Sequence, residues 1–184
     1  MLILRYCKGV TLIEMMIALV VLGLLITLAL PSYSTWIQNT QIRNAIESLS
    51  NGLRLARTEA VRRNVAVQMV IGPGASWTVS FGAPPATTIQ SYSGEAAALA
   101  SVSRFSGTPP VADATATTIT FNGLGRVVAN MDGSASVTQI DVDSASNPGD
   151  ARELRVAIDP ASGNVRSCDP QVSASDDPRY CLNP

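Results

Sequence analysis

Histidine is absent from this 184-residue chain, and lysine occurs once, at Lys8. Without histidine the chain lacks the commonest metal ligand of proteins and the commonest general base of enzymes. Asp141 and Asp143 lie two apart on an expected strand and so share a face. We interpret them as exposed side chains or a weak cation site rather than as an acid/base pair. The sequence therefore predicts no enzyme, no cofactor and no bound metal.

Charge is almost absent from one long segment, residues 10–30, whose single ionisable residue is Glu14. As a helix this segment is about 31 Å long, which is enough to span a bilayer core. A secretory signal has a shorter apolar core and a small-residue cleavage site after it, and neither is present here. Arg5 and Lys8 precede the segment and no charge follows it until Arg43. We therefore predict a membrane span with the N-terminus in the cytoplasm and the rest outside.

A charged residue such as Glu14 raises the free energy of membrane insertion by roughly 2.5–3.5 kcal/mol at mid-helix. We therefore expect Glu14 to have a partner. The simplest partner is an amine created at Val10 by cleavage after Gly9. One helical turn separates Val10 from Glu14, so both would lie on one helix face. The pattern predicts a cleaved leader, residues 1–9, and a role for Glu14 in assembly.

The chain has three cysteines, of which Cys7 lies in the leader. Cys168 and Cys181 lie in the part expected outside the cytoplasm, an oxidising compartment in bacteria. A disulfide between them closes a loop of about 14 residues, worth about 3 kcal/mol in the chain-entropy model. Two thiols without histidine do not complete a tetrahedral metal site, so we predict the disulfide. Without its leader the chain has 11 arginines against 14 acidic residues, which argues against strong nonspecific nucleic-acid binding.

A helical pattern continues past the apolar segment. Its apolar positions recur in steps of three and four, and charged or polar residues such as Arg43, Glu47, Ser50, Arg54 and Arg57 lie off this stripe. Pro31 should bend the helix without ending it. We predict one helix from Val10 to about Arg63, about 80 Å long, with residues 31–64 as its amphipathic half. The stripe consists of Ile42, Ile46, Leu49, Leu53, Ala56 and Ala60.

The pattern of residues 65–184 predicts one β-rich domain. The predicted fold class is therefore α+β, with a long N-terminal helix packed on antiparallel β-sheet. Two hairpins are expected, one over the Gly-Pro-Gly turn at 72–74 and one over Asn122-Gly123. We interpret residues 83–91 and 94–111 as variable loops with one short strand near Ser101–Phe105. The other expected strands are Val65–Ile71, Trp77–Phe81, Thr117–Phe121, Arg126–Met131, Val137–Val142, Glu153–Ile158 and Asn164–Ser167.

Residues 9–33, GVTLIEMMIALVVLGLLITLALPSY, resemble the class III signal of type IV prepilins and type II secretion pseudopilins. The resemblance implies cleavage after Gly9 by a prepilin peptidase and N-methylation of Val10. It also implies that Glu14 is the glutamate at the fifth mature position and that Pro31 is the helix-bending proline. Val10 differs from the phenylalanine that is commoner at its position.

Residues 53–64, LRLARTEAVRRN, and residues 121–126, FNGLGR, resemble the GspH/FimT family of minor pilins and pseudopilins. The resemblance implies a minor pilin of a type IV pilus, anchored in the inner membrane with a periplasmic domain, then placed at or near the pilus tip to help start assembly. The implied partners are other major and minor pilins, the peptidase and the inner-membrane assembly platform. A GspH-like pseudopilin of a type II secretion system is the alternative; the C-terminal cystine favours the pilus.

Some members of this family bind DNA during natural transformation through a C-terminal Gly-Arg-x-Arg motif. The corresponding stretch, residues 163–166, has Asn164 in place of the first arginine, which leaves Arg166 and Arg179 as candidate DNA contacts. Nearby aspartates would repel phosphate, so nucleic-acid binding is the less favoured alternative. We interpret the arginines of the helix end as a solvated or subunit-contact face; they are Arg54, Arg57, Arg62 and Arg63.

Overall fold

The computed structural model describes residues 9–82, 85–146 and 151–181, without the side chains of residues 28–32 and 96. The chain forms two compact units, Met1–Ile37 and Gln38–Pro184. Helix α1 (Leu12–Arg63) contributes to both units. The leader residues Arg5, Cys7 and Lys8 and the side chain of Pro31 lie outside the described part. Pro31 itself is within α1, as predicted.

The start of α1 differs from the prediction, because the helix begins at Leu12 and not at Val10. Thr11 is the capping residue: its Oγ1 accepts a hydrogen bond from the Glu14 N–H at 3.3 Å, as expected of a threonine N-cap. Val10 precedes this cap and has no helical conformation. The expectation that Val10 and Glu14 lie on one helix face therefore does not hold in the uncleaved chain.

The second half of α1 packs as its sequence pattern predicts. All six stripe residues from Ile42 to Ala60 are buried in one core with residues from both sheets. Ser50, predicted off the stripe, is buried as well. At Gly52 the helix lies so close to the sheet that an added Cβ would be 2.9 Å from Met69 Cε and from Trp77 Cδ2. The Trp77 indole N–H donates to Ser48 Oγ at 2.9 Å, which ties the helix to this sheet.

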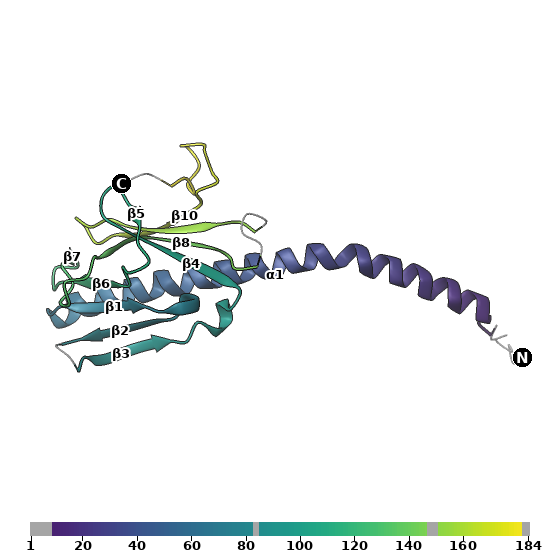
Figure 1. Ribbon diagram of the computed structural model, residues 1–184, viewed down its shortest axis with the longest axis horizontal. Helices are drawn as coiled ribbons and strands as arrows, with labels where there is room; N and C mark the ends of the chain where they lie inside the picture. Colours follow the sequence, from purple (N-terminus) through teal and green to yellow (C-terminus); the bar gives the residue numbers. More distant parts are fainter. Residues whose placement is uncertain (1–8, 83–84, 147–150, 182–184) are drawn as a thin grey trace, which may run out of the picture. The chain divides into compact units, whose positions relative to one another are not determined.

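Two five-stranded antiparallel sheets pack with this helix half (Figure 1), in the orders β3-β2-β1-β6-β7 and β10-β9-β8-β4-β5. Both predicted hairpins are present, as β1 with β2 and as β6 with β7. The structure also pairs β8 with β9. The strands of the first sheet are β1 (Val67–Ile71), β2 (Trp77–Phe81), β3 (Thr87–Tyr92), β6 (Thr118–Phe121) and β7 (Val127–Val128). Those of the second are β4 (Ala100–Ser106), β5 (Val111–Ala112), β8 (Val137–Ser144), β9 (Leu154–Ile158) and β10 (Val165–Cys168).

The interpretation of residues 83–91 as a loop is wrong, because β3 occupies most of that range and pairs with β2. β3 is an edge strand whose residues are exposed or half-buried, so it lacks the alternation of apolar residues that marks a strand. The short edge strand β5 was missed for the same reason. The short strand expected near Ser101–Phe105 is confirmed as part of β4.

Candidate assembly and tail sites

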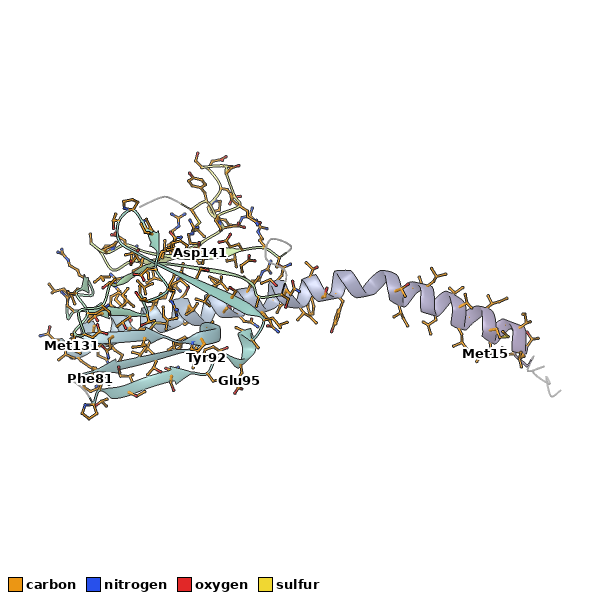
Figure 2. The ribbon with its side chains drawn as sticks, viewed as in Figure 1. Met15, Phe81, Tyr92, Glu95, Met131 and Asp141 are labelled. Atoms are coloured by element: carbon orange, nitrogen blue, oxygen red, sulfur yellow. A yellow bond between two sulfur atoms is a disulfide. The ribbon has the colours of Figure 1, made fainter. Side chains whose placement is uncertain are left out.

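The described first unit presents a continuous apolar surface. Each large apolar side chain between Val10 and Ile26 is about half exposed or more, up to 80% for Leu12, and Figure 2 shows Met15 projecting from the helix. The Thr27 hydroxyl donates back to the Leu24 carbonyl at 2.8 Å, so it presents no free donor. Among the residues whose side chains are described, no helical stretch is both long and apolar enough to cross a membrane.

Glu14 is the one charge on this surface and the third residue of α1. Thr11 and Glu14 have the spacing of a capping box, in which the threonine accepts from the backbone of the third helical residue. The structure contains that bond. A carboxylate in the first turn also interacts favourably with the positive end of the helix dipole. The backbone N–H of Glu14 therefore takes part in the helix cap, a feature that our sequence reasoning missed although Thr-x-x-Glu signals it.

The two internal motifs, residues 53–64 and 121–126, meet at the end of α1. Asn64 has a left-handed conformation, with φ 53°, and the Val65 N–H bonds to the Ala60 carbonyl at 3.3 Å. This is the Schellman arrangement that ends helices. An added Cβ on Gly123 would be 2.3 Å from Asn64 Oδ1. The helix end and the turn after β6 are thus fitted to each other.

Arg57 strengthens this junction and is not simply the solvated residue that we predicted. Its Nε donates to the Gly125 carbonyl at 3.1 Å and its Nη2 to the Ser162 carbonyl at 3.2 Å. One guanidinium from α1 therefore joins the turn after β6 to the turn before β10. Gly163 completes the contact, because its φ is 66° and an added Cβ would lie 2.0 Å from the Gly125 oxygen.

The last two arginines of α1 are paired with one carboxylate. Arg62 and Arg63 both donate to Glu59, the shortest distance being 2.7 Å for each. These hydrogen bonds, first that of Arg62 and then that of Arg63, lower the pKa of Glu59 to about 2. Arg63 also lies over the Phe81 ring, 4.5 Å from its centroid. Basic residues in the last turn favour the helix dipole, so this cluster stabilises the end of α1.

Asp141 is not the exposed side chain or weak cation site that we expected. It is 6% exposed, and Arg155 binds both of its carboxylate oxygens at 2.7 Å from the adjacent strand. Gln139 donates to the same two oxygens at 3.1 Å. The lone pairs that a cation would need are thus occupied. Nearby, burial and then the Asp141 carboxylate raise the pKa of Glu153.

The predicted disulfide between Cys168 and Cys181 is present. It holds the tail against β10, where the Asp169 N–H donates to the Arg179 carbonyl at 2.8 Å. Arg166 donates to the carbonyls of Pro178 and Tyr180. Arg179 is paired with Asp177 at 2.8 Å, and its hydrogen bond lowers the pKa of that aspartate to about 2. Both candidate DNA contacts are therefore bonded within the tail.

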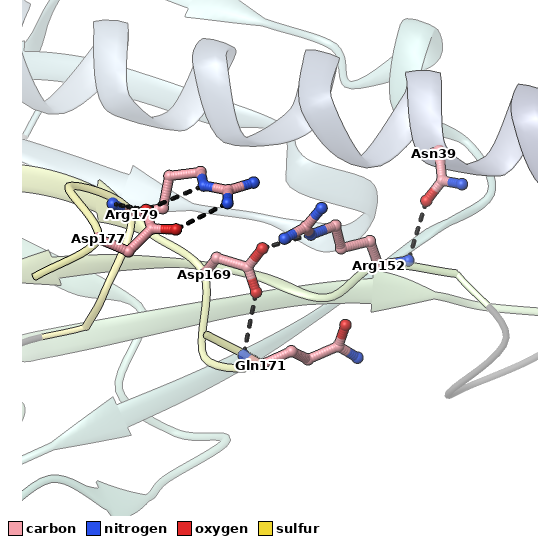
Figure 3. A network of polar contacts seen from close by, with 6 residues as sticks. All are labelled: Asn39, Arg152, Asp169, Gln171, Asp177 and Arg179. Carbon is pink, nitrogen blue, oxygen red and sulfur yellow. Dashed lines mark hydrogen bonds and ion pairs between the residues drawn. The ribbon is translucent and has the colours of Figure 1, made fainter. Parts of the chain in front are cut away.

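A second polar network lies between the tail and α1, as Figure 3 shows. Asp169 is buried and accepts from Arg152 Nε and from the Gln171 N–H. The backbone N–H of Arg152 donates to Asn39 Oδ1 at 2.9 Å. Sequence reasoning treated Asp169 only as a charge that repels phosphate, and nothing in the pattern shows that it meets Arg152, 17 residues earlier.

The chain combines an apolar helix half that has one carboxylate with an α+β domain whose sheets cover the other helix half. This combination defines a pilin-like protein. A family model described as type II transport protein GspH matches residues 45–163, and the prokaryotic N-terminal methylation motif matches residues 4–30. The chain belongs to the GspH family, within the type IV pilin superfamily.

Similar solved structures have the same fold. Two crystal forms of the minor pilin FimU of Pseudomonas aeruginosa superpose with a TM-score of 0.51 at 18% and 17% identity. The alignments cover 68% and 70% of this chain and 86% and 97% of FimU. The type IV major fimbrial protein FimA of Dichelobacter nodosus is 42% identical over 48 residues, which are 26% of this chain and 29% of FimA. The match thus spans less than a third of that relative.

Proposed function

We propose that this chain is a minor pilin of a type IV pilus that waits in the inner membrane and is then incorporated at or near the tip, where it helps to start assembly. The observation that supports this proposal most strongly is the apolar surface of residues 10–27. Glu14 is its one charged residue, and the same chain also has a folded pilin domain. Its partners would be other major and minor pilins, the prepilin peptidase and the assembly platform.

Processing fits the geometry at the N-terminus. Gly9 and Val10 are exposed and precede the capped helix, and nothing lies within 4 Å of a Cβ built on Gly9. Cleavage after Gly9 and methylation would leave a charged amine at Val10. In an apolar bundle, Glu14 of a neighbouring subunit would attract that amine strongly because the local dielectric is low. Pairing between subunits does not need Val10 and Glu14 of one chain to share a face.

The pairing is tested with Glu14→Val, which we expect to insert in the membrane normally and to be lost from pili. The measurement is the amount of tagged chain in sheared pili and in the membrane fraction, by immunoblot. Glu95→Val is the matched control, since Glu95 is an exposed acid in the second unit. Incorporation of Glu14→Val at the level of the control contradicts the pairing.

A GspH-like pseudopilin of a type II secretion system is the second candidate, and the match to the GspH model supports it. The two candidates predict different losses in a deletion strain: surface pili in the first case, secreted proteins in the second. DNA binding is less favoured because Arg166 and Arg179 are bonded within the tail. A gel shift at low salt that Arg166→Ala abolishes would reverse that order.

A further inference from the structure

A groove runs beside the exposed face of α1 in the second unit. It consists of two cavities of about 280 and 240 Å³ that share Ile46, Glu47 and Ser167 in their linings. The first cavity is also lined by Arg43, Arg152 and Arg179, and the second by Asn51 and Arg54. We call this feature the arginine groove. It collects four arginines in a chain whose acidic residues outnumber its basic ones.

The four arginines differ in their partners. Arg152 is held by Asp169 and Arg179 by Asp177. The side chains of Arg43 and Arg54 make no ion pair or hydrogen bond within residues 9–82, 85–146 and 151–181, and both residues are exposed. An arginine fork that has no carboxylate in its own chain can bind one from outside, and the bidentate geometry of the pair makes such binding specific.

Ser50 provides an independent sign of a ligand. It is 5% exposed, and its hydroxyl oxygen is buried without a hydrogen-bond partner. It also lines the second cavity, between Glu47 and Arg54 along the helix. A buried hydroxyl without a partner costs about 1–3 kcal/mol, so a polar group that enters the groove would remove this cost.

We propose that the arginine groove binds an extended acidic segment of a neighbouring pilin subunit. Arg43 and Arg54 are three helical turns apart, about 16.5 Å along the axis. This distance lies between the spans of four and six residues of extended chain, the spacings at which two side chains share one face. Two glutamates at either spacing would place one carboxylate at Arg43 and the other at Arg54. Glu47 would then lie between the two contacts along the helix. A nucleic-acid strand has closely spaced phosphates, and Glu47 and Asp169 would repel them. The identity of the donor as a pilin rests on the proposed function.

The proposal is tested on the full chain in neutral detergent micelles. The probe is a fluorescein-labelled Ser/Gly peptide with two glutamates six residues apart, which share one face of an extended chain, and its twin has glutamine at both places. We expect anisotropy to report binding of the glutamate peptide only, weakened by added NaCl because the contacts are screened. Arg43→Gln and Arg54→Gln should each weaken binding about two- to fivefold. Glu47→Gln, which removes a repelling charge, should strengthen it by a similar factor.

Arg126→Gln is the matched control, since Arg126 is an exposed arginine outside the groove lining, and it should leave the affinity unchanged. Equal binding of both peptides, or no effect of Arg43→Gln and Arg54→Gln, overturns the proposal. Tighter binding of a single-stranded DNA 12-mer through the same arginines overturns it in favour of nucleic acid. In cells, the groove variants should be processed normally but depleted from pili, whereas absence of the wild-type chain from pili would count against the proposed function and not against the groove.

Discussion

At the scale of single residues, the motif glycines and arginines of the second unit have structural tasks. Gly123 leaves room for Asn64, Gly163 leaves room for the Gly125 carbonyl, and Arg57 donates to two turns that are far apart in sequence. Gly163 opens residues 163–166, the stretch that resembles a DNA-binding motif, yet here its backbone conformation and its neighbours suffice to require glycine. The tail stretch is therefore weak support for nucleic-acid binding.

Gly163→Ala is expected to destabilise the chain by about 3 kcal/mol or more. The alanine must adopt a left-handed backbone, which costs about 1–2 kcal/mol, and its Cβ would overlap the Gly125 oxygen, which forces the backbone to move. Gly133→Ala separates these effects, because Gly133 has φ 75° and nothing within 4 Å of a built Cβ. Thermal unfolding followed by circular dichroism should show a much smaller loss for Gly133→Ala; equal losses would contradict the close approach.

At the scale of elements, the ion pairs that end α1 make helix stability depend on pH. The hydrogen bonds from Arg62 and then from Arg63 hold the folded-state pKa of Glu59 at about 2, below the ordinary value of 4.5 for a glutamate. Stabilisation by a depressed carboxyl is complete above the unfolded pKa and is lost as pH falls through the folded pKa. We expect the wild-type chain to exceed Glu59→Gln in unfolding free energy at pH 6, and the difference to shrink between about pH 4.5 and pH 2. A difference that stays constant over this range contradicts the pairing with Arg62 and Arg63.

The disulfide between Cys168 and Cys181 has a measurable effect on the stability of the tail. Replacing Cys168 and Cys181 by serine should cost about 3 kcal/mol in the chain-entropy model for a loop of this length. The loss should begin locally, with faster hydrogen exchange at the Asp169 amide, which donates to the Arg179 carbonyl. Amides of the β1–β2 hairpin serve as the internal reference and should lose less protection than the Asp169 amide. Equal losses of protection in both regions would mean that the tail is not a separate unit of stability.

Elements were predictable from the sequence where burial imposes a pattern. The stripe from Ile42 to Ala60 and the strands β2, β8 and β9 repeat apolar residues with the period of their structure. Edge strand β3 has no buried face, so the pattern was absent, and the division of the strands into two sheets was not predicted. The same limit applies to the candidate sites. The cystine could be predicted from compartment and composition, but Arg57, Asp169 and Arg155 find their partners through tertiary contacts that no local spacing encodes.

At the scale of the whole molecule, each unit carries a different part of the proposed function. The first unit presents an apolar surface with one carboxylate, suited to a membrane and then to a helical bundle. The second unit has a packed core, covers one face of α1, and leaves arginines of the other face exposed beside a groove. The proposed function would use both surfaces, the apolar one in the membrane and the bundle and the groove in contact with a neighbouring subunit.

The central claim is that the chain is cleaved between Gly9 and Val10 and then enters a pilus. Mass spectrometry of the tagged chain from sheared surface pili tests it directly. We expect an N-terminal peptide that begins with N-methylated Val10, contains Glu14, and is found in the pilus fraction of the wild type but not of Glu14→Val. Recovery of the chain only from membranes, or with residues 1–9 still attached in the pilus fraction, would contradict it.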